Sequence, residues 1–196
     1  MVIRKNWVVK ATKTTSRVLL FPFFRLETEG AENLPQKSAF ILLPKHQRWV
    51  DIPLLSLATP RSLYYVAKYD LFRNPFSNWL IRSLGGIPLN RQRPLESRQS
   101  LKAMVKFLVK GEGVVVFPEG TYYRNKIGPA HAGIVRLILS RFSIPFIPVG
   151  MNYSGKGVRT LVRINFGKAI YPDPSASAGP FLDTIMKEIA GLSGLR

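Results

Sequence analysis

The feature that most constrains the fold is an alternation, after Gly30, of short apolar runs with segments of helical periodicity. The apolar runs are punctuated by turn residues, which predicts buried strands at residues 38–44, 62–67, 86–89, 113–118 and 144–149. Residues 101–109 and 134–138 repeat apolar side chains at helical spacing. This alternation indicates an α/β fold, a single layered domain with a mixed central sheet flanked by helices. The order of the strands cannot be read from the alternation.

The C-terminal third adds two elements and one motif that fails. Residues 162–166 alternate like a strand, and residues 180–192 form a short amphipathic helix. The stretch GMNYSGKG (150–157) resembles a phosphate-binding loop, but Gly157 occupies the place of its Ser or Thr. The following residues alternate like a strand and do not open a helix. We therefore interpret 150–157 as part of a glycine-rich hairpin.

The charge balance predicts an anionic partner. The chain has 29 Lys and Arg against 11 Asp and Glu, a formal net charge of +18. Such a chain repels itself unless it meets negative charge, which nucleic acid, an anionic membrane or an acidic carrier protein would supply. The basic residues are spread through the sequence and no RNA-recognition run occurs, so we expect no nucleic acid.

The chain contains no cysteine and two histidines, His46 and His131. Thiol nucleophiles, disulfides and cysteine metal sites are therefore excluded, and no zinc-binding H-E-x-x-H motif occurs. We expect no metal and no cofactor. An imidazole base would have to be one of these two residues.

Residues 1–25 form a basic segment without acids that carries Trp7 and the apolar run 18–24. That run is shorter than the about 20 residues needed to span a bilayer, and Pro22 interrupts it. One interpretation is a helix lying on an anionic membrane surface. A core-packing helix with a solvated basic face, or a cleaved organellar presequence, would show a similar pattern. The domain proper would then be residues 26–196.

The stretch PKHQRWVDIP (44–53) leaves two interpretations open for His46. The predicted strand 38–44 delivers His46 into a loop, where Asp51 could hold one imidazole nitrogen and leave the other as a base. This pairing requires a loop, because five helical positions would place the two side chains about 140° apart. Alternatively, Asp51 caps a helix that starts near it, with Pro53 in the first turn, and His46 is a solvated loop residue.

Two further stretches place polar residues after strands. Arg91, in GGIPLNRQRP, could bind a phosphate through its planar guanidinium, or lie in a solvated basic turn. Glu119, in VFPEGTYYRNK, could hold a ligand or a neighbouring arginine, or simply pair with the surrounding positive charge.

Taken together, the order and spacing of these stretches resemble the glycerolipid acyltransferases. KHQRWVD resembles the family's H-x-x-x-x-D block, GGIPLNR its second block, VFPEGT its F-P-E-G-T block and IPFIPVGM its fourth block. The resemblance extends over about residues 26–170. It implies that His46 is the general base and Asp51 its partner. It also implies that Arg91 binds the acceptor's phosphate and that an acceptor site is shaped by Lys68, Glu119, Gly120 and Thr121.

The resemblance implies a membrane-associated enzyme at the cytoplasmic face. Its reaction would move a fatty acyl group from acyl-CoA or an acyl carrier protein to the free hydroxyl of 1-acyl-glycerol-3-phosphate. Two positions depart from the family pattern: Arg48 replaces a small residue, and Tyr122 replaces the arginine usual after E-G-T. Arg124 could take over part of that arginine's phosphate contact. Acylation of another lysolipid head group, or a non-catalytic membrane- or nucleic-acid-binding domain, are the alternatives.

Overall fold

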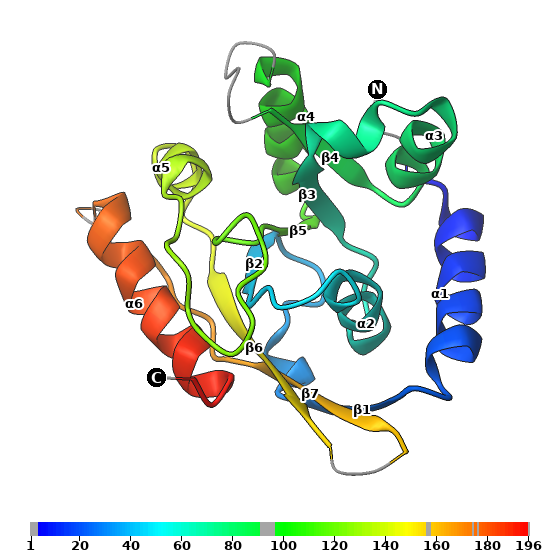
Figure 1. The fold of residues 1–196 in the computed structure, drawn as a ribbon. Helices are drawn as coiled ribbons and strands as arrows, with labels where there is room; N and C mark the ends of the chain where they lie inside the picture. Colours follow the sequence, from blue (N-terminus) through cyan, green and yellow to red (C-terminus); the bar gives the residue numbers. More distant parts are fainter. Residues whose placement is uncertain (1–3, 91–96, 156–157, 174, 176, 196) are drawn as a thin grey trace.

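The protein is built around one seven-stranded sheet (Figure 1). This computed structural model describes residues 4–90, 97–155, 158–173, 175 and 177–195. The strands are β1 (Phe24–Glu29), β2 (Phe40–Pro44), β3 (Tyr64–Lys68), β4 (Gly86–Leu89), β5 (Gly113–Val115), β6 (Phe146–Ser154) and β7 (Thr160–Phe166). Their spatial order is β1-β7-β6-β2-β5-β3-β4.

The sheet is mixed and mostly parallel. β6 and β7 are antiparallel neighbours and form a hairpin, as the glycine-rich stretch at 150–157 predicts. The other five pairings between these strands are parallel. The carboxyl ends of the central parallel strands therefore meet at one edge of the sheet, the usual place of a ligand site in such folds.

Helices cover both faces of the sheet (Figure 1). They are α1 (Asn6–Leu20), α2 (Asp51–Ala58), α3 (Pro75–Ser83), α4 (Arg98–Val109), α5 (Gly133–Leu139) and α6 (Ala178–Leu192), with two short 3-10 helices, η1 (Ala31–Asn33) and η2 (Tyr69–Phe72). Alternate residues of β2 point to opposite faces: Ile41 and Leu43 join one core, Phe40 and Leu42 the other. Each face of the central strand is thus buried, as its uninterrupted apolar sequence requires.

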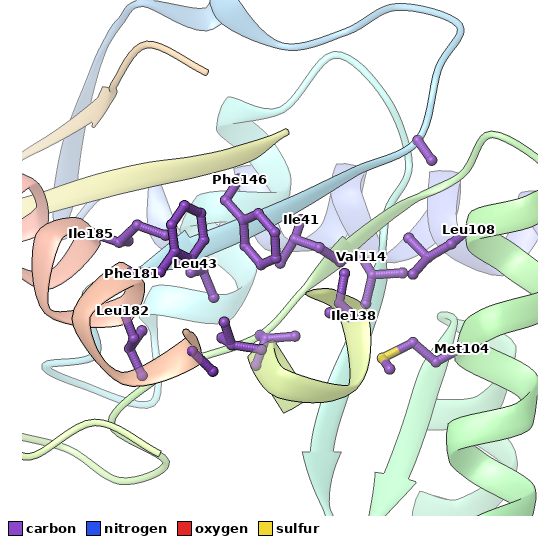
Figure 2. Close-up of a cluster of buried hydrophobic side chains, with 14 of the residues drawn as sticks. Ile41, Leu43, Met104, Leu108, Val114, Ile138, Phe146, Phe181, Leu182 and Ile185 are labelled. Carbon is purple, nitrogen blue, oxygen red and sulfur yellow. The ribbon is translucent and has the colours of Figure 1, made fainter. Parts of the chain in front are cut away.

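The larger core lies between the sheet and α4, α5 and α6 (Figure 2). Met104 of α4 and Ile138 of α5 contribute fully buried side chains to it. At its other end Phe146 packs edge-on against Phe181 of α6, with ring centroids 5.1 Å apart. The second core lies between the sheet and α2, where Leu54 and Leu55 are buried.

One strand and one α-helix, besides the two 3-10 helices, were not predicted from the sequence. β1 has the mixed sequence FRLETE and lies at an edge of the sheet, paired along its length with β7. Residues 24 and 25, which the sequence analysis placed with the basic segment 1–25, belong to this strand. α3 begins with Pro75, and its N-cap Asn74 accepts hydrogen bonds from the backbone N–H groups of Phe76 and Ser77.

Helix α1 turns several of its apolar side chains outward. Val8 and Val9 are buried, but the rest of the inward face carries Thr12, Lys13 and Ser16. The outward face exposes apolar side chains, including Trp7 and Val18, which are 64% and 66% exposed. Within the parts of the chain that the structure describes, no helix combines the length and hydropathy needed to cross a membrane.

Candidate active site

His46 lies in a short loop between β2 and α2. All five residues of β2 are buried, and Lys45 continues its ladder by donating its backbone N–H to Val149 O at 2.9 Å. The loop then runs to Asp51, the first residue of α2. Pro53 falls in the first turn of that helix, where a proline is tolerated. The local geometry is therefore the one that a contact between His46 and Asp51 requires.

The imidazole of His46 meets the carboxylate of Asp51. Nδ1 of His46 lies 2.9 Å from Oδ2 of Asp51, and the Asp51 side chain is fully buried. The same oxygen accepts the backbone N–H groups of Gln47 at 2.5 Å and Arg48 at 2.7 Å. Asp51 therefore folds the loop back onto itself. It does not serve as a helix N-cap, because Val50 occupies that position.

The second oxygen of Asp51 accepts a hydrogen bond from Tyr153 of β6. Burial raises the pKa of Tyr153, and the Asp51 charge and hydrogen bond raise it further. The phenol therefore stays protonated and keeps donating. The guanidinium of Arg48 lies 4.5 Å from the centroid of the Tyr153 ring, and its charge opposes the rise. Both oxygens of the Asp51 carboxylate thus take part in hydrogen bonds.

Two aromatic rings enclose the imidazole. The ring centroid of Phe117 lies 4.0 Å from that of His46, and Tyr122 approaches edge-on at 4.4 Å. His46 as a whole is only 7% exposed. Because Nδ1 is directed at Asp51, Nε2 is the nitrogen left to meet a reactant.

A buried ion pair lies behind the loop. The ammonium of Lys45 contacts both oxygens of Glu119, at 2.8 and 2.7 Å, and both side chains are fully buried. Burial lowers the pKa of Lys45, and the hydrogen bond and charge of Glu119 oppose that change. The Glu119 carboxylate also accepts the backbone N–H groups of His46 and Gly128. The pair therefore joins the His46 loop to the segment 119–128.

The dyad opens into a cavity of about 1050 Å³. His46, Phe117 and Tyr122 form one part of its wall. The rest comes from α1, α2, β3, η2, α3, β4 and adjoining loops, and most of the lining is apolar. A hollow of this size, with a few polar groups at one place, has the character of a small-molecule site.

The structure brings several of the sequence-derived candidates together at this cavity. Gly120 and Thr121 line it beside His46, and Gly120 adopts φ 67°, a left-handed conformation that favours glycine. Lys68 also lines it, with its exposed ammonium 2.7 Å from Asp70.

Other candidates lie elsewhere. Glu119 is enclosed by Lys45 and backbone N–H groups, so it holds the loops rather than facing the cavity. Arg124 is exposed and does not line the cavity. Arg91 lies outside the described residues.

Sequence reasoning missed the contacts of three residues of the site. Lys45, Tyr122 and Tyr153 contact Glu119, His46 and Asp51 respectively. The only local signal for Lys45 was a lysine directly after a fully apolar strand. Tyr153 had no such signal, because its partner is 102 residues away in sequence.

The fold and site thus define an α/β protein with a buried His–Asp dyad that faces a large apolar cavity. A family model described as Acyltransferase matches residues 25–152, and the chain belongs to this family. The resemblance found in the sequence motifs is thereby confirmed.

Two similar proteins also carry acyltransferase names. The chain is 30% identical to 1-acyl-sn-glycerol-3-phosphate acyltransferase BAT2, chloroplastic, of Brassica napus, over 74% of this chain and 42% of that protein. It is 32% identical to the 1-acyl-sn-glycerol-3-phosphate acyltransferase of Bacillus subtilis, over 64% of this chain and 62% of that protein. The chain therefore spans less than two thirds of the length of these relatives.

A solved structure shows the same fold. The 1-acyl-sn-glycerophosphate (LPA) acyltransferase PlsC from Thermotoga maritima superposes with a TM-score of 0.74, covering 96% of this chain and 80% of that one, at 24% identity. The seven-stranded mixed sheet is thus an architecture already seen in a solved structure.

Proposed function

We propose that this protein transfers a fatty acyl group from a thioester to the free hydroxyl of a lysophospholipid, with lysophosphatidic acid as the leading acceptor. The single observation that carries the proposal is the His46–Asp51 dyad at the wall of a large apolar cavity. A thioester of CoA or of an acyl carrier protein would supply the acyl group.

The dyad supports a direct transfer. Asp51 accepts a hydrogen bond from Nδ1–H of His46, which leaves Nε2 unprotonated as the base. Nε2 takes the proton of the acceptor hydroxyl as its oxygen attacks the thioester carbonyl. The carbon–sulfur bond breaks, and the departing thiolate receives the proton from the imidazolium. General base catalysis of this kind contributes about 10² to 10⁴ in rate.

The cavity supports an amphiphilic reactant. Its apolar lining suits an acyl chain, which gains about 0.8 kcal/mol for each CH₂ removed from water. Placing the chain along this wall would hold its carbonyl near His46. Much of the rate would then come from positioning two reactants.

The outward face of α1 supports contact with an anionic membrane. Trp7 and Val18 are exposed on it, beside the cations Lys10 and Arg17. At its N-terminal end α1 adjoins α3, where Lys5 Nζ lies 5.5 Å from the Trp79 ring centroid. We propose that this surface lies on the cytoplasmic face of a membrane, which is where both substrates would be found.

A second acceptor class has a specific observation in its favour. Among the cavity-lining residues that the structure describes, the cations are Lys13 and Lys68, and Lys68 is paired with Asp70. Because Tyr122 also stands in place of the family's usual arginine, few cations are available at the cavity to bind an acceptor's phosphate. Relatives named lyso-ornithine lipid O-acyltransferase, from Pseudomonas aeruginosa and Rhodobacter capsulatus, also match the chain. A lysolipid without phosphate is therefore the second candidate.

A panel of acceptors tests the proposal. Purified protein would receive palmitoyl-CoA with lysophosphatidic acid, lysophosphatidylcholine, lyso-ornithine lipid or monoacylglycerol, and mass spectrometry would identify the products. We expect lysophosphatidic acid to be the best acceptor and thioester loss to require an acceptor. Thioester loss that is equal with and without any acceptor would show that the protein is not an acyltransferase to lysolipids.

Arg91 provides the second arm of this experiment. A charge-assisted hydrogen bond is worth about 1.5 to 3 kcal/mol, so Arg91→Ala should lower kcat/KM for lysophosphatidic acid by about 10 to 100-fold. Arg124→Ala should show a smaller loss of the same kind. Equal losses for phosphate-bearing and phosphate-free acceptors would show that neither arginine binds the acceptor's phosphate.

A further inference from the structure

Helix α4 carries a row of cations on its exposed side. The row consists of Arg98, Lys102, Lys106 and the C-cap residue Lys110, and all four residues are exposed. Positions four apart in sequence lie on the same side of a helix, so this α4 stripe runs for about 18 Å along it. Met104 points to the opposite side, into the larger core. Residues 98–110 contain no acid, so the stripe carries charge of one sign only.

The fold does not balance the charges of the α4 stripe. None of its four side chains forms an ion pair with a residue that the structure describes. Like charges four residues apart destabilise a helix, and Arg98 adds a positive charge at the end where the helix dipole is already positive. Helix α6, in the same layer, instead carries Asp183 and Glu188 together with Lys187. The stripe therefore weakens α4 by itself and suits a partner that supplies negative charge.

The α4 stripe begins beside the cavity. Ser97, the N-cap of α4, donates its hydroxyl to the carbonyl of Asn90 at 2.9 Å and accepts the backbone N–H of Asn90 at 2.8 Å. Asn90 lines the same cavity as His46. A partner bound along α4 would thus lie next to the cavity, and a flexible arm of that partner could carry a bound group into it.

The place of α4 in the fold favours a soluble partner over a membrane. α4 packs with α5 and α6 on the larger core, whereas α1, whose outward face we assign to the membrane, contacts α2 and α3. A helix that lies on a membrane inserts apolar side chains as well as presenting cations. Val109 is the one large apolar side chain that α4, described over its whole length, exposes. The α4 stripe thus offers charge without an inserting apolar face.

We propose that the α4 stripe binds an acidic carrier protein, which delivers the acyl thioester to the cavity. The inference rests on the proposed function, because it takes His46 to act on a thioester, and it names the carrier of that thioester. Cations repeated at about one-turn intervals match a partner helix whose acidic side chains repeat at the same interval. Such complementarity speeds the encounter of two proteins. A CoA thioester has no such helix and would not depend on the stripe.

The test compares two donors that carry the same acyl group. The measured quantity is the ratio of kcat/KM for the palmitoyl thioester of a purified bacterial acyl carrier protein to that for palmitoyl-CoA, with the best acceptor from the panel above. We expect the double variant Lys102→Glu/Lys106→Glu to lower this ratio by about tenfold, since charge steering contributes about 10- to 10³-fold to association. The loss should lie in KM and leave palmitoyl-CoA turnover unchanged. Raising the ionic strength should shrink the difference from the wild type, because salt screens exposed charges.

A second double variant is the matched control. Lys168→Glu/Lys187→Glu makes the same change in net charge at two exposed positions that do not line the cavity. Both positions adjoin β6, because α6 contacts this strand and the residues flanking Lys168 bond to it, whereas α4 contacts β4 and β5. The ratio should therefore keep its wild-type value in this control.

The α4 variant should fold as well as the wild type. Each substituted position lies four residues from a remaining cation, Arg98 or Lys110, so the new carboxylates would attract these side chains. A thermal melt of both double variants checks that neither substitution unfolds the protein.

The outcomes separate this inference from the proposed function. Transfer from palmitoyl-CoA alone, equal losses for both donors in the α4 variant, or equal falls of the ratio in the two double variants would overturn the docking surface and leave the acyltransferase activity standing. Flotation with anionic vesicles is measured in parallel. Weaker flotation of the α4 variant with an unchanged ratio would assign the stripe to the membrane and overturn the proposal. Absence of transfer from both donors would remove the proposed function, and this inference with it.

Discussion

Lys45 and Glu119 form a fully buried ion pair, Nζ to Oε2 2.7 Å, directly behind the catalytic candidate His46. The ammonium also donates to the carbonyls of His46 and Tyr123, at 3.1 and 2.8 Å. Each partner thus has several hydrogen bonds besides the ion pair. The pair connects two loops that both reach the cavity. Loss of the ion pair would therefore also disturb the shape of the site.

Breaking this pair from one side should strongly destabilise the fold. Lys45→Met or Glu119→Gln leaves one buried charge without its partner, which costs about 3 to 5 kcal/mol. The double variant Lys45→Met/Glu119→Gln should be less destabilised than the sum of the two single variants, because no unpaired charge remains. Urea denaturation of the three variants measures this, and additive losses would show that the two charges are not coupled.

Removing the imidazole should abolish catalysis without unfolding the protein. His46→Ala should lower kcat by about 10² to 10⁴, because the proton acceptor is lost. Asp51→Asn should also be severe, since the amide no longer holds the Nδ1 proton as a carboxylate does. The control is His131→Ala, at an exposed position of the loop before α5. Near-native turnover in His46→Ala would show that the base lies elsewhere.

Tyr153 should make the fold sensitive to alkaline pH. Burial and Asp51 raise the pKa of Tyr153 in the folded protein, whereas an unfolded tyrosine ionises near pH 10. Above about pH 10 the unfolded chain therefore binds fewer protons than the folded one, and stability falls as pH rises. Tyr153→Phe should make this fall less steep. The free energy of unfolding at pH 8 and at pH 10.5 measures the effect, and an identical slope in the variant would contradict it.

The outward face of α1 should bind anionic vesicles. Trp7→Ser and Val18→Ser remove exposed apolar side chains from this face and should weaken flotation with vesicles that contain anionic lipid. Salt should weaken binding of the wild type as well, by screening about 1 kcal/mol per basic residue near the surface. Val109→Ser, on α4, removes an equally exposed apolar residue and should have no effect. Equal flotation of all three variants would exclude α1 as the contact surface.

Much of the fold could be predicted because its signals are local. The central strands β2 and β5 are short and apolar, β6 begins with an apolar run, and α4 and α6 repeat apolar residues at helical spacing. The residues around His46 left its pairing with Asp51 open, and the resemblance of the motifs to the acyltransferase family favoured it. Five residues separate them, and only a loop that ends in a helix start lets two such side chains meet.

Other features depended on contacts between distant segments. β1 has an irregular burial pattern and becomes a strand only through its register with β7, where Phe24 faces Thr160. The strand order likewise joins segments far apart in sequence. The β1–β7 pairing and the strand order leave no periodic signal in the sequence of any single segment.

The sequence by itself determined the α/β class, the alternating elements, the His–Asp loop and the family. Only the tertiary structure decided what surrounds that loop. Lys45 is buried because Glu119, 74 residues away, compensates its charge, and Asp51 is held at its second oxygen by Tyr153. The physical reason is that periodicity reports which face of an element is buried, whereas the partner of a buried charge or hydroxyl is set by how the elements pack together.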